Sequence, residues 1–93
     1  GPWKHTSVRA GDVSDPYLMT GYDPKTLTLM SSKPARITAE VDITGNGLWV
    51  PYRSFDVDAN AELTCEFPED FSACWIRFRS SNEGEVSAQL VYD

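Results

Sequence analysis

One short stretch of the sequence, "CWIRFRSS" (residues 74–81), carries the side chains best suited to binding a ligand. Its side chains alternate in character, as in a β-strand that buries one face and exposes the other. On the outward face, an indole can stack on a sugar ring, and an arginine fork can bind a carboxylate or sulfate through two hydrogen bonds. We therefore predict a binding face suited to an acidic or sulfated glycan. Its residues are Trp75, Arg77 and Arg79, joined by Trp49, Tyr52 and Arg53.

The same outward side chains also have a purely structural interpretation. The N-terminal loop would cover Trp75, Arg77 would pair with Glu62 on a neighbouring strand, and Arg79 would be solvated. Ion pairs of this exposed kind are common in proteins and contribute little to stability. The sequence leaves the binding face and the structural interpretation open.

Catalytic and metal-binding patterns are weaker. The single histidine, His5, lies close to the N-terminus, and the sequence has no nucleophile elbow, glycine-rich phosphate loop or zinc-protease motif. We therefore expect no catalytic residues and no enzyme activity. Hard oxygen ligands near predicted strand ends suit calcium, but their spacing matches no EF-hand loop, so we expect no cofactor and keep calcium as an alternative. The calcium candidates are Asp42, Asn46, Asp56 and Asp58.

The elements that must position these residues are strands. Apolar and polar residues alternate with a period of two in five stretches, and turn residues such as "TGNG" and "SNEG" separate them. Short strands with turns every 8–12 residues or so predict an antiparallel β-sandwich of about seven to eight short strands, jelly-roll or immunoglobulin-like. The five stretches are residues 26–30, 36–43, 62–67, 74–78 and 85–92.

The register of the first hairpin follows from its turn, "TGNG". Centring the hairpin there pairs Val41 with Val50 and Ile43 with Leu48. In this register, however, the apolar side chains further along the second strand would point outward, although they should be buried. A bulge near Pro51 reconciles the two, because proline within a sheet is confined to edges and bulges.

A second hairpin, centred on "PEDF", would place Leu63 opposite Ile76 and Cys65 opposite Cys74. Directly opposed Cβ atoms lie about 4.5–5.5 Å apart, which allows a disulfide after some adjustment. Two free buried thiols, acting as small apolar side chains, are the alternative. The spacing of the two cysteines matches no zinc motif.

The N-terminal third is less regular. A strand is predicted near residues 7–10, followed by a loop that contains two Asp-Pro steps. This loop carries Tyr17, Leu18, Met19 and Tyr22, and it is too apolar to extend into solvent. We expect it to fold over one end of the sandwich.

Size and charge bound the remaining possibilities. Gly1-Pro2 looks like a tag-cleavage scar, and residues 3–93 are expected to form a single β-sandwich domain. The net charge of −6 argues against nucleic acid and anionic membrane as partners. No run of about 18 apolar residues occurs, so we expect no membrane span. We expect a monomer.

Four stretches together resemble a known kind of module. The resemblance is to a small C-terminal all-β accessory module of large bacterial polysaccharide-active enzymes, such as sialidase-like and propeller-type glycosidases. It implies a non-catalytic carbohydrate-binding module that targets an appended glycoside-active enzyme to a polysaccharide or oligosaccharide, in a secreted, periplasmic or cell-surface bacterial protein. The stretches are "GDVSDPYLMTGYDPKTLTL" (11–29), "AEVDITGNGLWVPYRSFDV" (39–57), "FPEDFSACWIRFRS" (67–80) and "SAQLVYD" (87–93).

A structural or interaction role is the alternative to carbohydrate binding. In that case the domain packs against the catalytic domain of the same parent chain and stabilises it. The loop "DPYLMTGYD" would form the docking surface, because tyrosine and methionine are favoured at interfaces. The acidic stretch "SSNEGE" (80–85) is expected to lie beside the arginines and could neutralise them.

Overall fold

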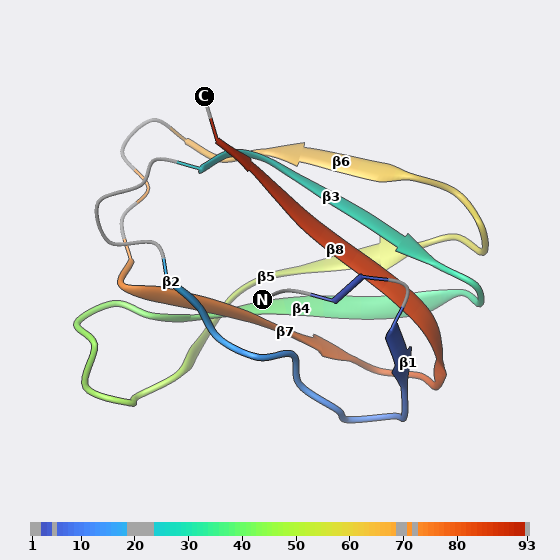
Figure 1. The fold of residues 1–93 in the computed structure, drawn as a ribbon, viewed down its shortest axis with the longest axis horizontal. Coiled ribbons are helices and arrows are strands. Elements are labelled where there is room, and N and C mark those ends of the chain that lie inside the picture. Colours follow the sequence, from blue (N-terminus) through green and yellow to red (C-terminus); the bar gives the residue numbers. More distant parts are fainter. Residues whose placement is uncertain (1–2, 5, 19–23, 69–70, 72, 93) are drawn as a thin grey trace.

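Two antiparallel sheets of four strands each make up the fold (Figure 1). The computed structural model describes residues 3–4, 6–18, 24–68, 71 and 73–92. Among these residues no helix is long and apolar enough to cross a membrane. The strands are β1 (Thr6–Val8), β2 (Tyr17–Leu18), β3 (Pro24–Ser31), β4 (Ala35–Asp42), β5 (Val50–Val57), β6 (Leu63–Glu66), β7 (Trp75–Ser80) and β8 (Gly84–Tyr92).

The strand order identifies the kind of sandwich. Sheet A has the order β1-β8-β3-β6, and sheet B has the order β2-β7-β4-β5. The first strand pairs with the last, the second with the seventh, the third with the sixth and the fourth with the fifth. This is a long hairpin rolled up on itself, which is the jelly-roll arrangement. The predicted antiparallel β-sandwich is confirmed, and its topology is jelly-roll rather than immunoglobulin-like.

The core lies between the two sheets, where alternate residues of each strand meet. On β3 the inward residues Leu27 and Leu29 are fully buried, and on β7 the same is true of Ile76 and Phe78. Removing such apolar side chains from water is the main driving force for folding. The period-two pattern therefore predicted the inward faces of these strands correctly.

The β4–β5 hairpin confirms two of the sequence predictions and corrects a third. Val41 pairs with Val50 as predicted, and the register shifts beside Pro51, where a bulge was expected. Ile43 and Leu48 do not form a buried pair, since they are 59% and 67% exposed. The hairpin ladder ends at Val41 and Val50, and the chain between them forms a wide loop.

Asp42 explains why this loop is wide. Its buried carboxylate accepts hydrogen bonds from the backbone N–H groups of Gly45, Asn46 and Gly47, at 2.9, 3.3 and 2.9 Å. Gly45 and Gly47 have φ angles of 77° and 84°, which favour glycine. The sequence "TGNG" therefore wraps around a carboxylate instead of forming a two-residue turn.

The predicted hairpin between β6 and β7 is wrong. Cys65 on β6 pairs with Leu27 of β3 in sheet A, whereas β7 lies between β2 and β4 in sheet B. In a rolled-up hairpin, the link from β6 to β7 crosses from one sheet to the other, so these neighbours in sequence do not pair. Cys65 and Cys74 are accordingly free thiols, as in the second of the two alternatives, but both are half-buried rather than buried.

The N-terminal segment covers an edge rather than an end of the sandwich. After β1, which lies close to its predicted place, the chain runs beside β7 (Figure 1). The N–H of Gly11 donates to the carbonyl of Ser80 at 2.8 Å, and the N–H of Ser14 donates to the carbonyl of Phe78 at 2.8 Å. These bonds satisfy backbone groups on a strand edge that would otherwise be open. Met19 and Tyr22 lie outside the described residues.

Candidate functional site

The structure divides the six predicted binding residues between two places. Arg77 and Arg79 point outward from β7 in sheet B, and the half-buried Trp75 shares their parity on the same strand. Trp49 lies beneath the guanidinium of Arg77. Tyr52 and Arg53 lie instead at the edge formed by β5. The predicted face is therefore not one continuous site.

Arg77 is held on two sides by its own protein. Its Nε donates to Oε1 of Glu40 at 2.7 Å, and its guanidinium carbon lies 4.3 Å from the centre of the Trp49 ring. The Arg77 and Glu40 side chains are only 22% and 14% exposed. A charged hydrogen bond and a cation–π contact in a partly buried place both stabilise the charged form of the arginine.

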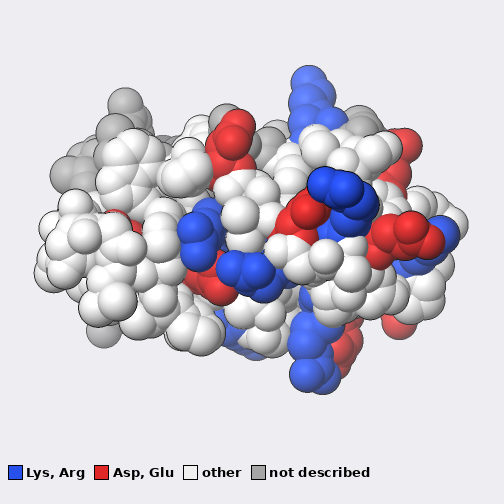
Figure 2. Space-filling model, turned by 90° about the horizontal axis from the view of Figure 1, so that it is seen from below, with Lys and Arg blue, Asp and Glu red and all other residues white. Residues whose placement is uncertain are grey.

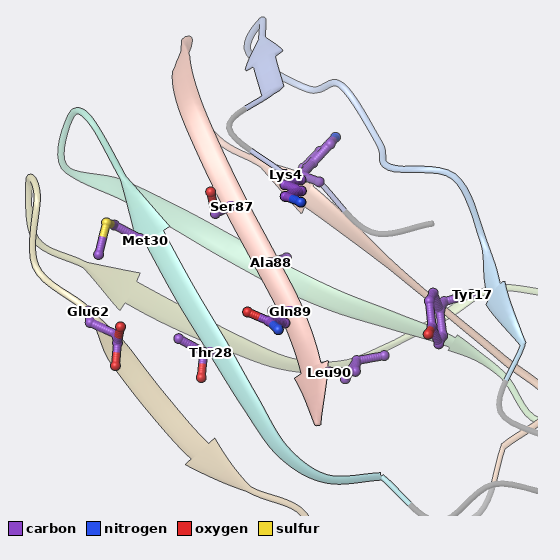
Figure 3. A pocket seen from close by; sticks show the side chains of 10 residues that line it. Lys4, Tyr17, Thr28, Met30, Glu62, Ser87, Ala88, Gln89 and Leu90 are labelled. Carbon is purple, nitrogen blue, oxygen red and sulfur yellow. The ribbon is translucent and has the colours of Figure 1, made fainter. Parts of the chain in front are cut away.

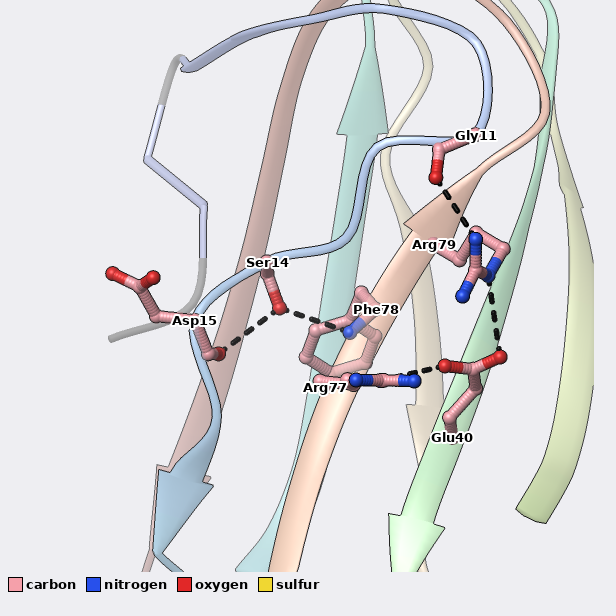
Figure 4. A network of polar contacts seen from close by, with 7 residues as sticks. All are labelled: Gly11, Ser14, Asp15, Glu40, Arg77, Phe78 and Arg79. Carbon is pink, nitrogen blue, oxygen red and sulfur yellow. Dashed lines mark hydrogen bonds and ion pairs between the residues drawn. The ribbon is translucent and has the colours of Figure 1, made fainter. Parts of the chain in front are cut away.

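Arg79 shares the same carboxylate (Figure 4). Its Nε donates to Oε2 of Glu40 at 3.2 Å, and its Nη1 donates to the carbonyl of Gly11 at 2.9 Å. One glutamate thus receives two guanidinium groups, one on each oxygen. We call Glu40, Arg77, Arg79 and Trp49 the arginine cluster.

The electrostatics of Glu40 favour its ionised form. Burial alone would raise the pKa of this carboxyl, but the hydrogen bonds and positive charges of Arg77 and Arg79 outweigh burial and hold the pKa below its ordinary value near 4.5. Glu40 is therefore charged at neutral pH and neutralises part of the cluster. Seen from below, basic side chains lie next to acidic ones over the middle and right of the molecule (Figure 2).

The partner predicted for Arg77 was the wrong glutamate. Glu62 lies just before β6, in the other sheet, and Glu40 takes its place by pairing in register with Arg77 across β4 and β7. From the acidic stretch "SSNEGE", Glu83 pairs with Lys33 at 3.5 Å. The alternation in residues 36–43 had placed Glu40 on an outward face, but only the strand order shows which strand lies beside it.

Tyr52 and Arg53 help to close the side of the sandwich between β5 and β6. The Tyr52 ring contacts two phenylalanine rings, with centroids at 6.2 Å from Phe67 and 4.8 Å from Phe71. Nη1 of Arg53 lies 3.3 Å from Sγ of Cys65, and its guanidinium carbon lies 5.2 Å from the centre of the Phe55 ring. These contacts join the edge strands of the two sheets.

The four calcium candidates do not converge. The Asp42 carboxylate accepts three backbone N–H groups, and the side-chain oxygen of Asn46 accepts the N–H of Leu48 at 3.0 Å. Asp56 and Asp58 lie at the other end of β5, where Asp56 pairs with Arg36 at 3.1 Å. Over the described part of the chain, no group of three or more histidine, cysteine, aspartate or glutamate side chains is placed to hold a metal ion.

A groove on sheet A was missed by the sequence analysis. It has a volume of about 470 Å³, within the roughly 300–1,000 Å³ typical of small-molecule sites. Figure 3 shows its side chains coming from β3 and β8 and from the segment before β6. The lining residues are Trp3, Lys4, Tyr17, Thr28, Met30, Glu62, Ser87, Ala88, Gln89 and Leu90.

The floor of the groove consists of two cross-strand pairs on the outer face. Thr28 pairs in register with Gln89, and Met30 pairs with Ser87. Among the described residues, the Thr28 hydroxyl and the Gln89 amide have no hydrogen-bond partner in the protein. Both groups can donate and accept hydrogen bonds. The alternation in residues 26–30 and 85–92 places these side chains outward, which is the signal from which they could have been found.

Taken together, the fold and these surfaces define a jelly-roll domain with a polar groove on one sheet and an arginine cluster on the other. No model of a known protein family matches the chain, and no curated protein matches it significantly. The function is therefore argued from the surfaces themselves.

Proposed function

We propose that this domain is a non-catalytic carbohydrate-binding module that targets an appended glycoside-active enzyme to a polysaccharide. The observation that carries the proposal is the groove on sheet A, where hydroxyl and amide groups face solvent beside apolar side chains. Sugars offer the matching combination, because hydroxyl groups surround a ring with apolar faces. The module resemblance given above implies the same role, in a secreted, periplasmic or cell-surface bacterial protein.

The groove supports this function better than the arginine cluster does. Its polar side chains Thr28 and Gln89 have no protein partner among the described residues, so a ligand would not have to break existing bonds. In the cluster, a ligand anion would have to displace Glu40 from two arginines. Jelly rolls include lectin domains, but the fold also serves many other functions, so the groove carries more weight than the fold.

The proposal is tested by measuring binding of the chain to a panel of neutral, acidic and sulfated polysaccharides by affinity electrophoresis and calorimetry. Thr28→Val combined with Gln89→Ala removes the polar groups of the groove floor. We expect about thirtyfold weaker binding, because two hydrogen bonds are lost and each costs about 1 kcal/mol. Arg79→Ala and Trp75→Ala on the other sheet are the matched controls, which should bind normally.

Three outcomes separate the possibilities. Loss of binding in the groove variant alone supports the proposal. Loss in the Trp75→Ala variant alone keeps the function but moves the site to sheet B. A folded chain that binds no polysaccharide in the panel contradicts the function.

An interaction role is the second candidate, and one observation favours it. Ile43 and Leu48 are 59% and 67% exposed on the β4–β5 loop, within a run of ten residues (43–52) that carries no charge. In Figure 2, the described residues at the left end of the molecule correspondingly show almost no charged side chains. Removing residues 3–93 from the parent enzyme should lower its melting temperature if this domain packs against the catalytic domain, and should leave it nearly unchanged otherwise.

A further inference from the structure

We propose that the groove on sheet A selects uncharged polysaccharide and rejects chains that carry carboxylate or sulfate groups. This inference rests on the proposed carbohydrate-binding function and deepens it by assigning the charge class of the ligand. It reverses the expectation from the sequence, in which the arginines indicated an acidic or sulfated glycan.

Among the described residues, the acidic side chains in and beside the groove outnumber the basic ones. Glu62 lines the groove and is exposed, and Glu66 follows at the same parity along the adjacent edge strand β6. Within the described part of the chain, Lys4 is the one basic residue that lines the groove. An anionic ligand would therefore approach a surface of its own sign, on a chain of net charge −6.

The arginines that could offset this repulsion lie elsewhere. Arg77 and Arg79 are on sheet B and are bound to Glu40, and Arg36 is paired with Asp56. Arg53 points toward Cys65 and Phe55 at the β5 edge. No arginine lines the groove among the residues that the structure describes, so a carboxylate or sulfate there would lack a two-pronged partner.

The groups that do face the groove match uncharged sugars. A hydroxyl at Thr28 and an amide at Gln89 can each donate to and accept from a sugar hydroxyl. The half-buried Met30 adds apolar surface on which a sugar ring can lie. None of these groups favours a charged ligand over a neutral one.

The test compares one polysaccharide in two charge states. A neutral glucan or mannan that binds in the panel is oxidised at C6 to its carboxylate form, and both forms are titrated into the chain at low and high salt. We expect the oxidised form to bind about threefold to tenfold more weakly than the neutral form at low salt. This difference in affinity should shrink at high salt, because salt screens the repulsion.

Two variants identify the source of the repulsion. Glu62→Gln should reduce the ratio of the affinities for the neutral and the oxidised polysaccharide by about twofold to threefold. Glu83→Gln is the matched control, since Glu83 pairs with Lys33 and does not line the groove, and it should leave the difference unchanged. A difference that responds neither to salt nor to Glu62→Gln would overturn the inference, because it would then arise from shape or lost hydrogen bonds.

The failures of the two proposals are distinguishable. If the chain binds acidic polysaccharides as well as neutral ones or better, the charge selectivity is wrong and the carbohydrate-binding function stands. If the chain binds no polysaccharide of any charge, both are wrong.

Discussion

The arginine cluster and the groove lie on opposite sheets, and they differ in what their polar groups bind. In the cluster, Arg77 and Arg79 donate to Glu40, and Arg77 also stacks on Trp49. In the groove, Thr28 and Gln89 have no partner among the described residues. The first surface resembles the interior of a protein in this respect, whereas the polar groups of the second surface are available to a ligand.

The difference shows that the type of a side chain does not by itself tell whether the side chain is available to a ligand, because that depends on its partners within the protein. Tryptophan and arginine are the residues most often expected to bind ligands, yet here they satisfy one another. A threonine and a glutamine attract little attention in a sequence, yet they are the groups available to a ligand. Stability and binding should therefore respond to mutation on different faces of the molecule.

The largest expected effect is a loss of stability when the arginine cluster is disrupted. Glu40→Gln leaves two guanidinium groups without their anion in a partly buried place, and we expect a loss of about 2 kcal/mol in the free energy of unfolding. For a domain of this size, that corresponds to a fall in melting temperature of roughly 8–15 °C. Urea titration and thermal unfolding measure both. Glu62→Gln in the groove is the matched control. An equal loss of stability in the two variants would contradict the difference drawn between the cluster and the groove.

The pH dependence of stability gives a second, smaller effect. Because the pKa of Glu40 is lowered in the folded state, its contribution is complete above its ordinary value near 4.5 and is lost as the pH falls through the folded pKa. The difference in unfolding free energy between the wild-type protein and Glu40→Gln should therefore be constant at neutral pH and shrink below that value. A difference that persists unchanged in acid would mean that the ion pairs are not its cause.

The contact between Arg77 and Trp49 should contribute less than the ion pairs. A double-mutant cycle with Arg77→Met and Trp49→Leu measures it, and we expect a coupling of about 0.5–1 kcal/mol in unfolding free energy. A coupling near zero would show that the indole only covers the guanidinium without attracting it.

The smallest stability effect is expected in the groove. Thr28→Val and Gln89→Ala should each change the free energy of unfolding by less than about 0.5 kcal/mol, since neither side chain has a protein partner among the described residues. The two variants should nevertheless weaken polysaccharide binding, as described above. If either variant destabilised the fold strongly, the groove would be a structural feature like the cluster.

Much of the fold was predictable because local alternation reports burial directly. The inward residues of β3, β4, β7 and β8 followed from the period of two, and the bulge beside Pro51 followed from a change of parity. The loop after β4 was predicted as a tight turn, because nothing in "TGNG" shows that the Asp42 carboxylate will turn inward and bind three N–H groups. Pairing between β6 and β7 failed for a different reason, since adjacency in sequence does not imply adjacency in a sheet.

Most strands, and the apolar face of each, could be predicted from the sequence because both depend on near neighbours along the chain. The short strand β2 is an exception, since its residues Tyr17 and Leu18 were expected in a loop. The contacts between outward side chains, in contrast, depend on the folded structure. Folding brings Glu40 to Arg77 and Arg79, which follow it by 37 and 39 residues along the chain, and it leaves the Thr28–Gln89 pair facing solvent. Such contacts depend on the order of strands in each sheet. That order is set by the packing of the whole jelly roll and not by any single stretch of the sequence. The stretch "CWIRFRSS" thus carries a stabilising cluster, and the groove lies on the other sheet.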